Sequence, residues 1–183
     1  MSETISKETI FFPKGYGPAE GSPVEPCVFN GRLHQAFLRA VLIDAVPGGL
    51  PAPEFGHLVI SDRTYAPIAR QQLAVLRDWT LERLPLQPTF TAESFDCDDF
   101  AMLLKSFASL FAHEIGAVLP FALGIVWGRF AHAGDRLHAA NIAVLNSGEV
   151  LWIEPQHLLR DTPEQVDGSW ILPPPDAVTR LLF

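Results

Sequence analysis

Apolar residues recur at helical spacing in three stretches of the chain. The first stretch, HQAFLRAVLIDAV, stops before the turn residues PGGLPAP, and its stripe consists of Ala36, Phe37, Ala40, Val41 and Ile43. The second, YAPIARQQLAVLRDWTLERL, follows Asp62 and Thr64, which are residue types that cap helices. Pro67 is close enough to its start to be tolerated. Both patterns predict amphipathic helices.

The third helical pattern is the strongest in the chain. Its apolar residues follow three- and four-residue spacing: Phe100, Leu103, Leu104, Phe107, Leu110 and Phe111. Lys105 is the only lysine, arginine or acidic residue from 100 to 113, so we expect this helix to be mostly enclosed. Ser94 or Asp96 would cap it, which places Cys97 in its first turn.

After Pro120 the pattern changes to short runs of β-branched and aromatic residues. FALGIVWGRF, LHAANIAVL and EVLWIEP are separated by AHAGD and NSG, which predicts an antiparallel meander, and HLVI further upstream predicts one more short strand. The loop Asn146, Ser147 and Gly148 would pair Leu145 with Glu149. Helices followed by a meander indicate an α+β fold.

That loop also predicts which side chains meet on the sheet. If residue 145 pairs with 149, the numbers of opposed residues sum to 294, so Glu154 opposes Ala140. Successive side chains alternate between faces, so His138 shares a face with Glu154 and is its diagonal neighbour. Asn141 falls on the opposite face and is expected to be structural.

Length and composition indicate one domain. A chain of 183 residues with 48% hydrophobic residues can bury a core of its own. Residues 1–30 are rich in proline and glycine and are expected to be a tail with loops that pack on the body formed by residues 31–183.

Charge and cysteine content narrow the partners and the compartment. A net charge of -8, with 13 basic residues that do not cluster, argues against nucleic acid and anionic membranes as partners. The two cysteines, Cys27 and Cys97, are too few for a disulfide framework, which favours a reducing compartment. The sequence has no pattern of a signal peptide or a membrane span, so we expect a soluble, cytoplasmic protein.

Three residues together suggest nucleophilic chemistry. Cys97 stands at a helix N-terminus, where the helix dipole favours a thiolate, His138 opens one strand and Glu154 closes the next. A thiol, a base and an orienting carboxylate are the parts that acyl transfer at cysteine requires. His132 and His157 are weaker alternatives for the base. Taken singly, each residue is also compatible with a structural role.

The acids around the thiol suggest a metal ion. Asp96, Asp98 and Asp99 surround Cys97 with negative charge, which opposes the effect of the dipole on the thiol. A divalent cation held by their oxygens would reverse that charge. Ligands that are all oxygen at short spacing suit Ca²⁺ or Mn²⁺ better than Zn²⁺.

The strings DCDDFA, HAAN and WIEPQ resemble a known family. They are similar to the papain-like, metal-dependent cysteine protease domain at the C-terminal end of the fairy-ring mushroom agglutinin and in related chains, over roughly residues 62–160. The resemblance implies a papain-like or transglutaminase-like fold, with Cys97, His138 and Glu154 as catalytic residues. It also implies that Asp98, Asp99 and Gln156 bind calcium or manganese. No sugar-binding β-trefoil is expected here, so a lectin role lacks support.

Three functions remain open at this stage. The first is a metal-activated cysteine peptidase that acts on peptide or protein substrates through the triad. The second is an acyl transferase of transglutaminase type, and the third is a metal-binding protein of the same fold without turnover. The sequence does not identify a substrate.

Overall fold

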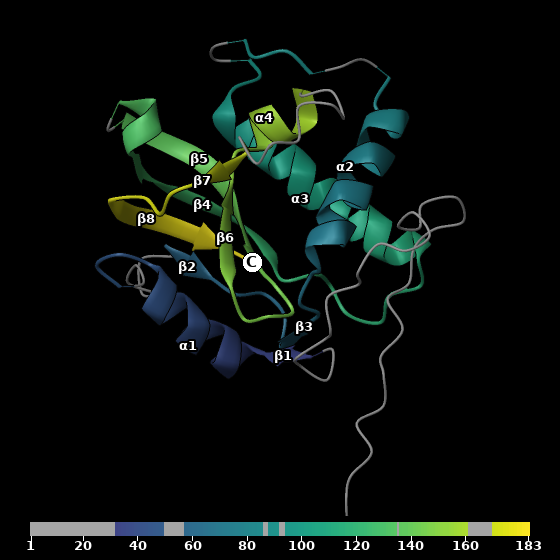
Figure 1. Ribbon diagram of the computed structural model, residues 1–183, viewed down its shortest axis with the longest axis horizontal. Coiled ribbons are helices and arrows are strands. Elements are labelled where there is room, and N and C mark those ends of the chain that lie inside the picture. Colours follow the sequence, from purple (N-terminus) through teal and green to yellow (C-terminus); the bar gives the residue numbers. More distant parts are fainter. Residues whose placement is uncertain (1–31, 50–56, 86–87, 92–93, 135, 161–169) are drawn as a thin grey trace, which may run out of the picture.

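The computed structural model describes residues 32–49, 57–85, 88–91, 94–134, 136–160 and 170–183, and Figure 1 shows how their elements are arranged. The helices are α1 (Gln35–Ala45), α2 (Arg70–Arg83), α3 (Cys97–Glu114), the 3₁₀ helix η2 (Ala131–Ala133) and α4 (Pro155–Arg160). The strands are β1 (Leu33–His34), β2 (Leu58–Val59), β3 (Thr64–Tyr65), β4 (Leu123–Phe130), β5 (Arg136–Val144), β6 (Val150–Ile153), β7 (Ile171–Leu172) and β8 (Ala177–Leu182).

A six-stranded mixed sheet lies between two helical layers. Its order is β2-β8-β4-β5-β6-β7, with only the β2–β8 pair parallel, and β1 and β3 form a separate antiparallel pair. Helices α2, α3 and α4 lie on one side of the large sheet and α1 lies on the other (Figure 1). The α+β class expected from the sequence is confirmed. The predicted meander accounts only for β4, β5 and β6.

Each face of the sheet packs into its own core, because side chains alternate along the strands. Leu123, Ala143 and Ile153 pack with residues of α2 and α3 in one buried cluster. Ile142 and Trp152 belong to a second cluster, which includes residues of α1. The chain therefore buries both faces of the sheet, and helix α3 covers the face from which Asn141 projects.

The β5–β6 hairpin has the predicted register. Asn141 pairs with Ile153 and Val144 with Val150, so the opposed numbers sum to 294 as expected. The turn is closed by a hydrogen bond from the N–H of Leu145 to the carbonyl of Glu149 at 2.8 Å. Gly148 has φ of 84°, a left-handed conformation that glycine adopts without steric cost.

Strand β8 was not predicted from the sequence. It inserts between β2 and β4, and its close approach to β4 depends on two glycines. A Cβ atom at Gly124 would lie 2.6 Å from the carbonyl oxygen of Leu182, and one at Gly128 would lie 2.5 Å from that of Ala177. Local sequence patterns do not reveal such a partner, because the segments that pair are separated by about fifty residues.

Two details of the helices differ from the prediction. In α1 the fully buried residues are Leu38 and Leu42, whereas Phe37 is 44% exposed and Ile43 is 51% exposed, so the predicted stripe was wrong. Helix α2 begins at Arg70 rather than directly after Thr64, because Thr64 and Tyr65 form β3 instead.

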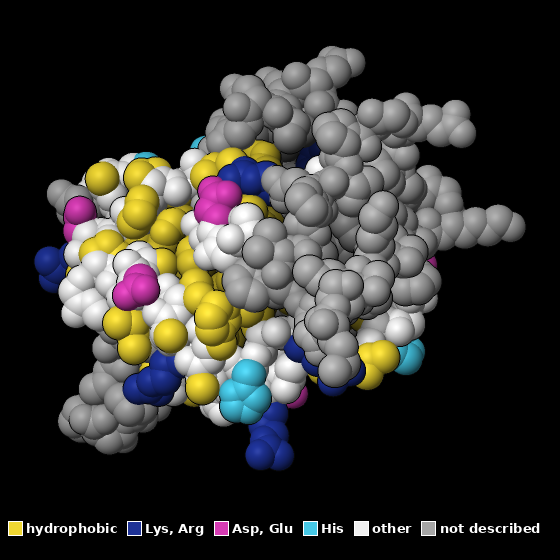
Figure 2. Space-filling model, turned by 60° about the horizontal axis from the view of Figure 1, so that its bottom comes forward, with side chains coloured by type: hydrophobic (Ala, Val, Ile, Leu, Met, Phe, Trp, Pro, Cys, Tyr) yellow, Lys and Arg dark blue, Asp and Glu magenta, His cyan; other side chains and the backbone are white. Residues whose placement is uncertain are grey.

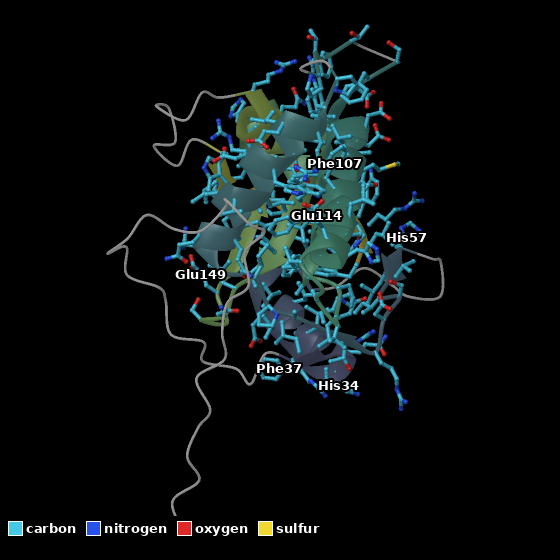
Figure 3. All side chains as sticks on the ribbon, turned by 90° about the vertical axis from the view of Figure 1, so that its right-hand side faces the viewer. His34, Phe37, His57, Phe107, Glu114 and Glu149 are labelled. Atoms are coloured by element: carbon cyan, nitrogen blue, oxygen red, sulfur yellow. The ribbon has the colours of Figure 1, made fainter. Side chains whose placement is uncertain are left out.

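The surface over α1 retains apolar side chains. Figure 2 shows hydrophobic side chains gathered on the described part of this face, with acidic and basic side chains scattered among them. Phe37 and His34 lie at the end of the molecule away from Phe107 (Figure 3). Among the described residues, none of the helices is long and apolar enough to cross a membrane. The predicted tail of residues 1–30 lies outside the described residues, as does Cys27.

Candidate functional site

The first turn of α3 presents the thiol. Asp96 is the N-cap, and its side chain accepts a hydrogen bond from the N–H of Asp98, while the carboxylate of Asp99 accepts one from the N–H of Asp96. This capping box fixes the turn that carries half-buried Cys97. The sulfur also accepts a hydrogen bond from the N–H of Ala139 in β5 at 3.5 Å. Cys97 is therefore held between a helix start and the central sheet.

His138 connects the thiol to a buried carboxylate. Its Nε2 lies 2.7 Å from Oε2 of Glu154, and the Glu154 side chain is only 4% exposed. Burial alone would lower the pKa of His138, but its interactions with Cys97 and Glu154 outweigh that effect and raise the pKa to about 9. His138 is thus protonated at neutral pH, and Nδ1 is the ring nitrogen left for the sulfur.

Glu154 is the charged partner that keeps His138 protonated. Burial would raise its pKa, but the hydrogen bond and charge of His138 lower it, so the carboxylate is ionised at neutral pH. Its Oε1 accepts a hydrogen bond from the N–H of Gln156 at 3.2 Å. The N–H of Glu154 donates to the carbonyl of Trp170 at 2.8 Å, so Glu154 lies beside β7 rather than on a free edge.

His132 is a member of the site that the sequence underrated. Its Nε2 lies 3.2 Å from the same Oε2 of Glu154, and its ring centroid is 5.1 Å from that of His138. Residues 131–133 form the 3₁₀ helix η2, and Gly134 ends it with a φ of 68°. His157, the other alternative base, is exposed on α4.

The three aspartates have unequal roles. Capping accounts for Asp96 and Asp99, which leaves the Asp98 carboxyl without a capping function. A hydrogen bond to Asp96, burial and the charges of Asp96 and Asp99 raise the pKa of Asp98. The ligand atoms of Asp96, Cys97 and Asp98 lie within 4.8 Å of one another. Gln156, also predicted to bind the metal, contributes its backbone N–H to Glu154.

Asn141 is structural, as its position on the sheet predicted. It is fully buried, and its Nδ2 donates to the carbonyls of Ala101 in α3 and Gly124 in β4, both at 3.0 Å. These bonds join α3, which carries Cys97, to β4 and to β5, the strand that carries His138. Asn141 therefore supports the alignment of the site without facing it.

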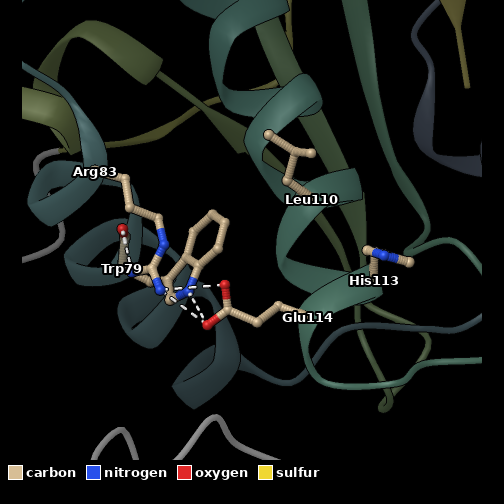
Figure 4. A pocket seen from close by; sticks show the side chains of 5 residues that line it. All are labelled: Trp79, Arg83, Leu110, His113 and Glu114. Atoms are coloured by element: carbon tan, nitrogen blue, oxygen red, sulfur yellow. Dashed lines mark hydrogen bonds and ion pairs between the residues drawn. The ribbon is translucent and has the colours of Figure 1, made fainter.

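A hollow of about 550 Å³ lies at the other end of α3 (Figure 4). It is lined by Trp79, Arg83, Leu110, His113 and Glu114. Arg83 pairs with both carboxylate oxygens of Glu114, at 2.9 and 3.1 Å, and lies over the Trp79 ring. Arg83, Glu114 and Nε1 of Trp79 already have partners, so the hollow is a weaker candidate for chemistry than the thiol site.

The comparisons with known proteins show the fold alone. No protein-family model and no curated protein matches the chain. A structure described as the PSL1a-E64 complex is similar, with a TM-score of 0.59 and 23% identity over 84% of this chain and 51% of that one. A structure of Polyporus squamosus lectin bound to the epitope Neu5Acα2-6Galβ1-4GlcNAc has a TM-score of 0.52 and 23% identity over 69% of this chain and 43% of that one. This chain thus spans about half the length of these proteins.

These neighbours correct the family assignment made from the sequence. One is described as a lectin and neither as a protease, so the predicted membership of a papain-like cysteine protease family was wrong. The predicted peptidase function, its transferase alternative, the inactive member of that same fold and the assignment as a hydrolase are withdrawn with it, whereas the calcium or manganese ion stays a prediction. The peptide substrate is withdrawn as well. Short sequence motifs indicate which side chains meet at one site, and that local arrangement does not determine the function of the whole protein.

Proposed function

We propose that this chain is a ligand-binding domain built around a reactive cysteine, which forms a covalent adduct with an electrophilic ligand. The observation that carries the proposal is the chain of contacts from Cys97 through His138 to Glu154. A protonated imidazole beside a sulfur stabilises the thiolate, which is the nucleophilic form of cysteine. The start of α3 and the N–H of Ala139 add positive dipoles at the same sulfur.

The adduct requires only groups that the site holds. With an aldehyde ligand, a bond forms between the sulfur of Cys97 and the carbonyl carbon, and the π electrons of the carbonyl move to its oxygen. The imidazolium of His138 donates its proton to that oxygen, which leaves a neutral imidazole and a neutral adduct. Glu154 keeps the ring oriented throughout, because its Oε2 stays bonded to Nε2. The step is reversible and involves no turnover.

We also propose that Ca²⁺ or Mn²⁺ binds at the start of α3 and adjusts this site. Asp96 and Asp98 supply hard oxygen ligands, which these ions prefer, and Asp99 and Gln156 are the further ligands expected from the sequence. The raised pKa of Asp98 supports the fit, since it reflects crowding of negative charge that a cation would relieve. Water would complete the coordination. A free thiol of this kind also favours a reducing compartment such as the cytoplasm.

Alkylation kinetics test the reactive cysteine directly. Iodoacetamide should modify Cys97 at neutral pH with loss of iodide, and intact-mass measurement should show no modification at this position in Cys97→Ser. His138→Gln should slow the reaction by roughly thirtyfold, because an ordinary thiol is only a few per cent ionised at pH 7. His113→Gln, on the exposed end of α3, is the matched control and should react at the unmodified rate. A His138→Gln protein that reacts as fast as the control would overturn the proposal.

Carbohydrate binding is a second candidate function, favoured by the lectin among the structural neighbours. The shared part is 43% of that lectin's chain, so the glycan contacts of the lectin can lie in the remainder. Titration calorimetry with Neu5Acα2-6Galβ1-4GlcNAc tests this candidate. Binding that persists in Cys97→Ser would assign the glycan to a different surface from the thiol, and an absence of heat at millimolar glycan would reject the candidate.

A further inference from the structure

We propose that His132, His138 and Glu154 form a binding site for a transition-metal ion, best matched by Zn²⁺. The binding site stands on its own geometry. It depends neither on the thiol of Cys97 nor on the proposed function.

The three ligand atoms already converge. Nε2 of His138 and Nε2 of His132 lie 2.7 and 3.2 Å from Oε2 of Glu154, and all three atoms lie within 4.8 Å of one another. Zn²⁺ binds such atoms at roughly 2.0 to 2.2 Å, so in a tetrahedral site they would lie about 3.3 Å apart. Shifts of about 1 Å at the ends of the side chains would admit the ion.

The kinds of ligand select the metal. Two imidazoles and one carboxylate are a donor set that suits zinc with a fourth, open position. Calcium prefers oxygen ligands and more of them, so this cluster and the aspartates at the start of α3 would select different ions. The orienting role of Glu154 requires only one histidine, and the second imidazole on the same oxygen is what a metal site would add.

The surroundings hold the two rings in place. The buried ring of Phe130 makes edge contacts with His132 and His138, at centroid distances of 5.5 and 5.7 Å. Gly134 fixes the end of η2, which positions the backbone of His132. The His132 side chain is 31% exposed, whereas that of Glu154 is 4% exposed. An ion can therefore enter past His132 and meet a carboxylate shielded from water.

Binding of the ion is an exchange with protons. Zn²⁺ would take Nε2 of His138 and Nε2 of His132, and the protons that the cluster gives up would pass to the solvent, with no change in oxidation state.

Zinc binding is measured in protein that lacks both cysteines, because cysteines bind zinc themselves. In full-length Cys27→Ser/Cys97→Ser protein, competition with a chromophoric chelator should give one tight site per chain. His132→Ala in this background should weaken zinc at least about tenfold, since even groups that only support ligands contribute that much. His113→Ala should leave it unchanged. Co²⁺ should produce the visible bands of a tetrahedral site, and these should disappear in the His132→Ala background. Equal zinc affinity with and without His132, or an absence of zinc binding once the thiols are removed, would overturn the site.

Discussion

The two ends of helix α3 both bring charged side chains against aromatic ones, yet they differ in how the charges are balanced. At the C-terminal end, Glu114 accepts hydrogen bonds from Arg83 and from Nε1 of Trp79, which joins α3 to α2. At the N-terminal end, Asp98 is crowded by like charges, and His138 is held protonated between Cys97 and Glu154. The charges at the C-terminal end are paired and join two helices, whereas the N-terminal end brings like charges close together.

This difference explains why the hollow beside Glu114 is not the better candidate site. The hollow beside Glu114 is lined by an ion pair that is already satisfied, with Arg83 stacked 4.1 Å from the centre of the Trp79 ring. Perturbed pKa values cluster where charges are forced together, and functional sites need them. The electrostatics of the described residues therefore point to the thiol end.

The largest expected effect is a dependence of stability on pH at the thiol end. The pKa of His138 rises from 6.5 to about 9 on folding, so its contribution is fully present below about pH 6.5 and is lost as the pH rises through 9. The free energy of unfolding should fall by up to about 3 kcal/mol between pH 6 and pH 9.5. Urea unfolding at each pH, in the presence of a chelator, measures this free energy. His138→Gln should flatten this slope and Glu114→Gln should keep it, so equal slopes in all three proteins would contradict the comparison.

The next effect is that of Glu154 on thiol reactivity. Glu154→Gln keeps the shape but removes the charge that holds His138 protonated, and an opposite charge at this distance is worth one to three pKa units. Alkylation of Cys97 at pH 7 should therefore slow by at least about tenfold, and the pKa of His138, followed by NMR, should fall. A variant that alkylates at the unmodified rate would show that Glu154 only fills space.

A smaller effect is expected from Asp98. In chelator, Asp98→Asn should raise the alkylation rate of Cys97 severalfold, because it removes a carboxyl from a crowded group and leaves the capping residues intact. The same variant should bind Mn²⁺ more weakly, as electron paramagnetic resonance can measure. Asp78→Asn, an exposed carboxylate on α2, is the control. A slower reaction in Asp98→Asn would mean that the carboxylate and the sulfur do not interact.

The smallest effect belongs to the other end of the helix. Glu114→Gln breaks an ion pair whose side chains are 38% and 43% exposed, and such pairs contribute less than about 1 kcal/mol. Thermal unfolding should show a small loss, and alkylation of Cys97 should be unchanged. A change in thiol reactivity would show that the two ends of α3 are coupled.

Local pattern was sufficient wherever the chain interacts with nearby residues. The start of α3 follows from Asp96 and the apolar spacing after it, and the β5–β6 register follows from a three-residue loop that ends in Gly148. The contact between His138 and Glu154 could be predicted for the same reason, since a known register places diagonal neighbours.

Tertiary structure decided what depends on distant partners. The buried face of α1, the insertion of β8 against Gly124 and Gly128, and the approach of His132 to Glu154 all depend on segments that meet only in the folded chain. The family was misjudged on similar grounds, because a few short strings record how one site is assembled and carry little information about the rest of the surface. Burial of side chains and the pKa of His138 are properties of the assembled core, where distant groups set the local dielectric and charge, and sequence spacing alone does not contain them.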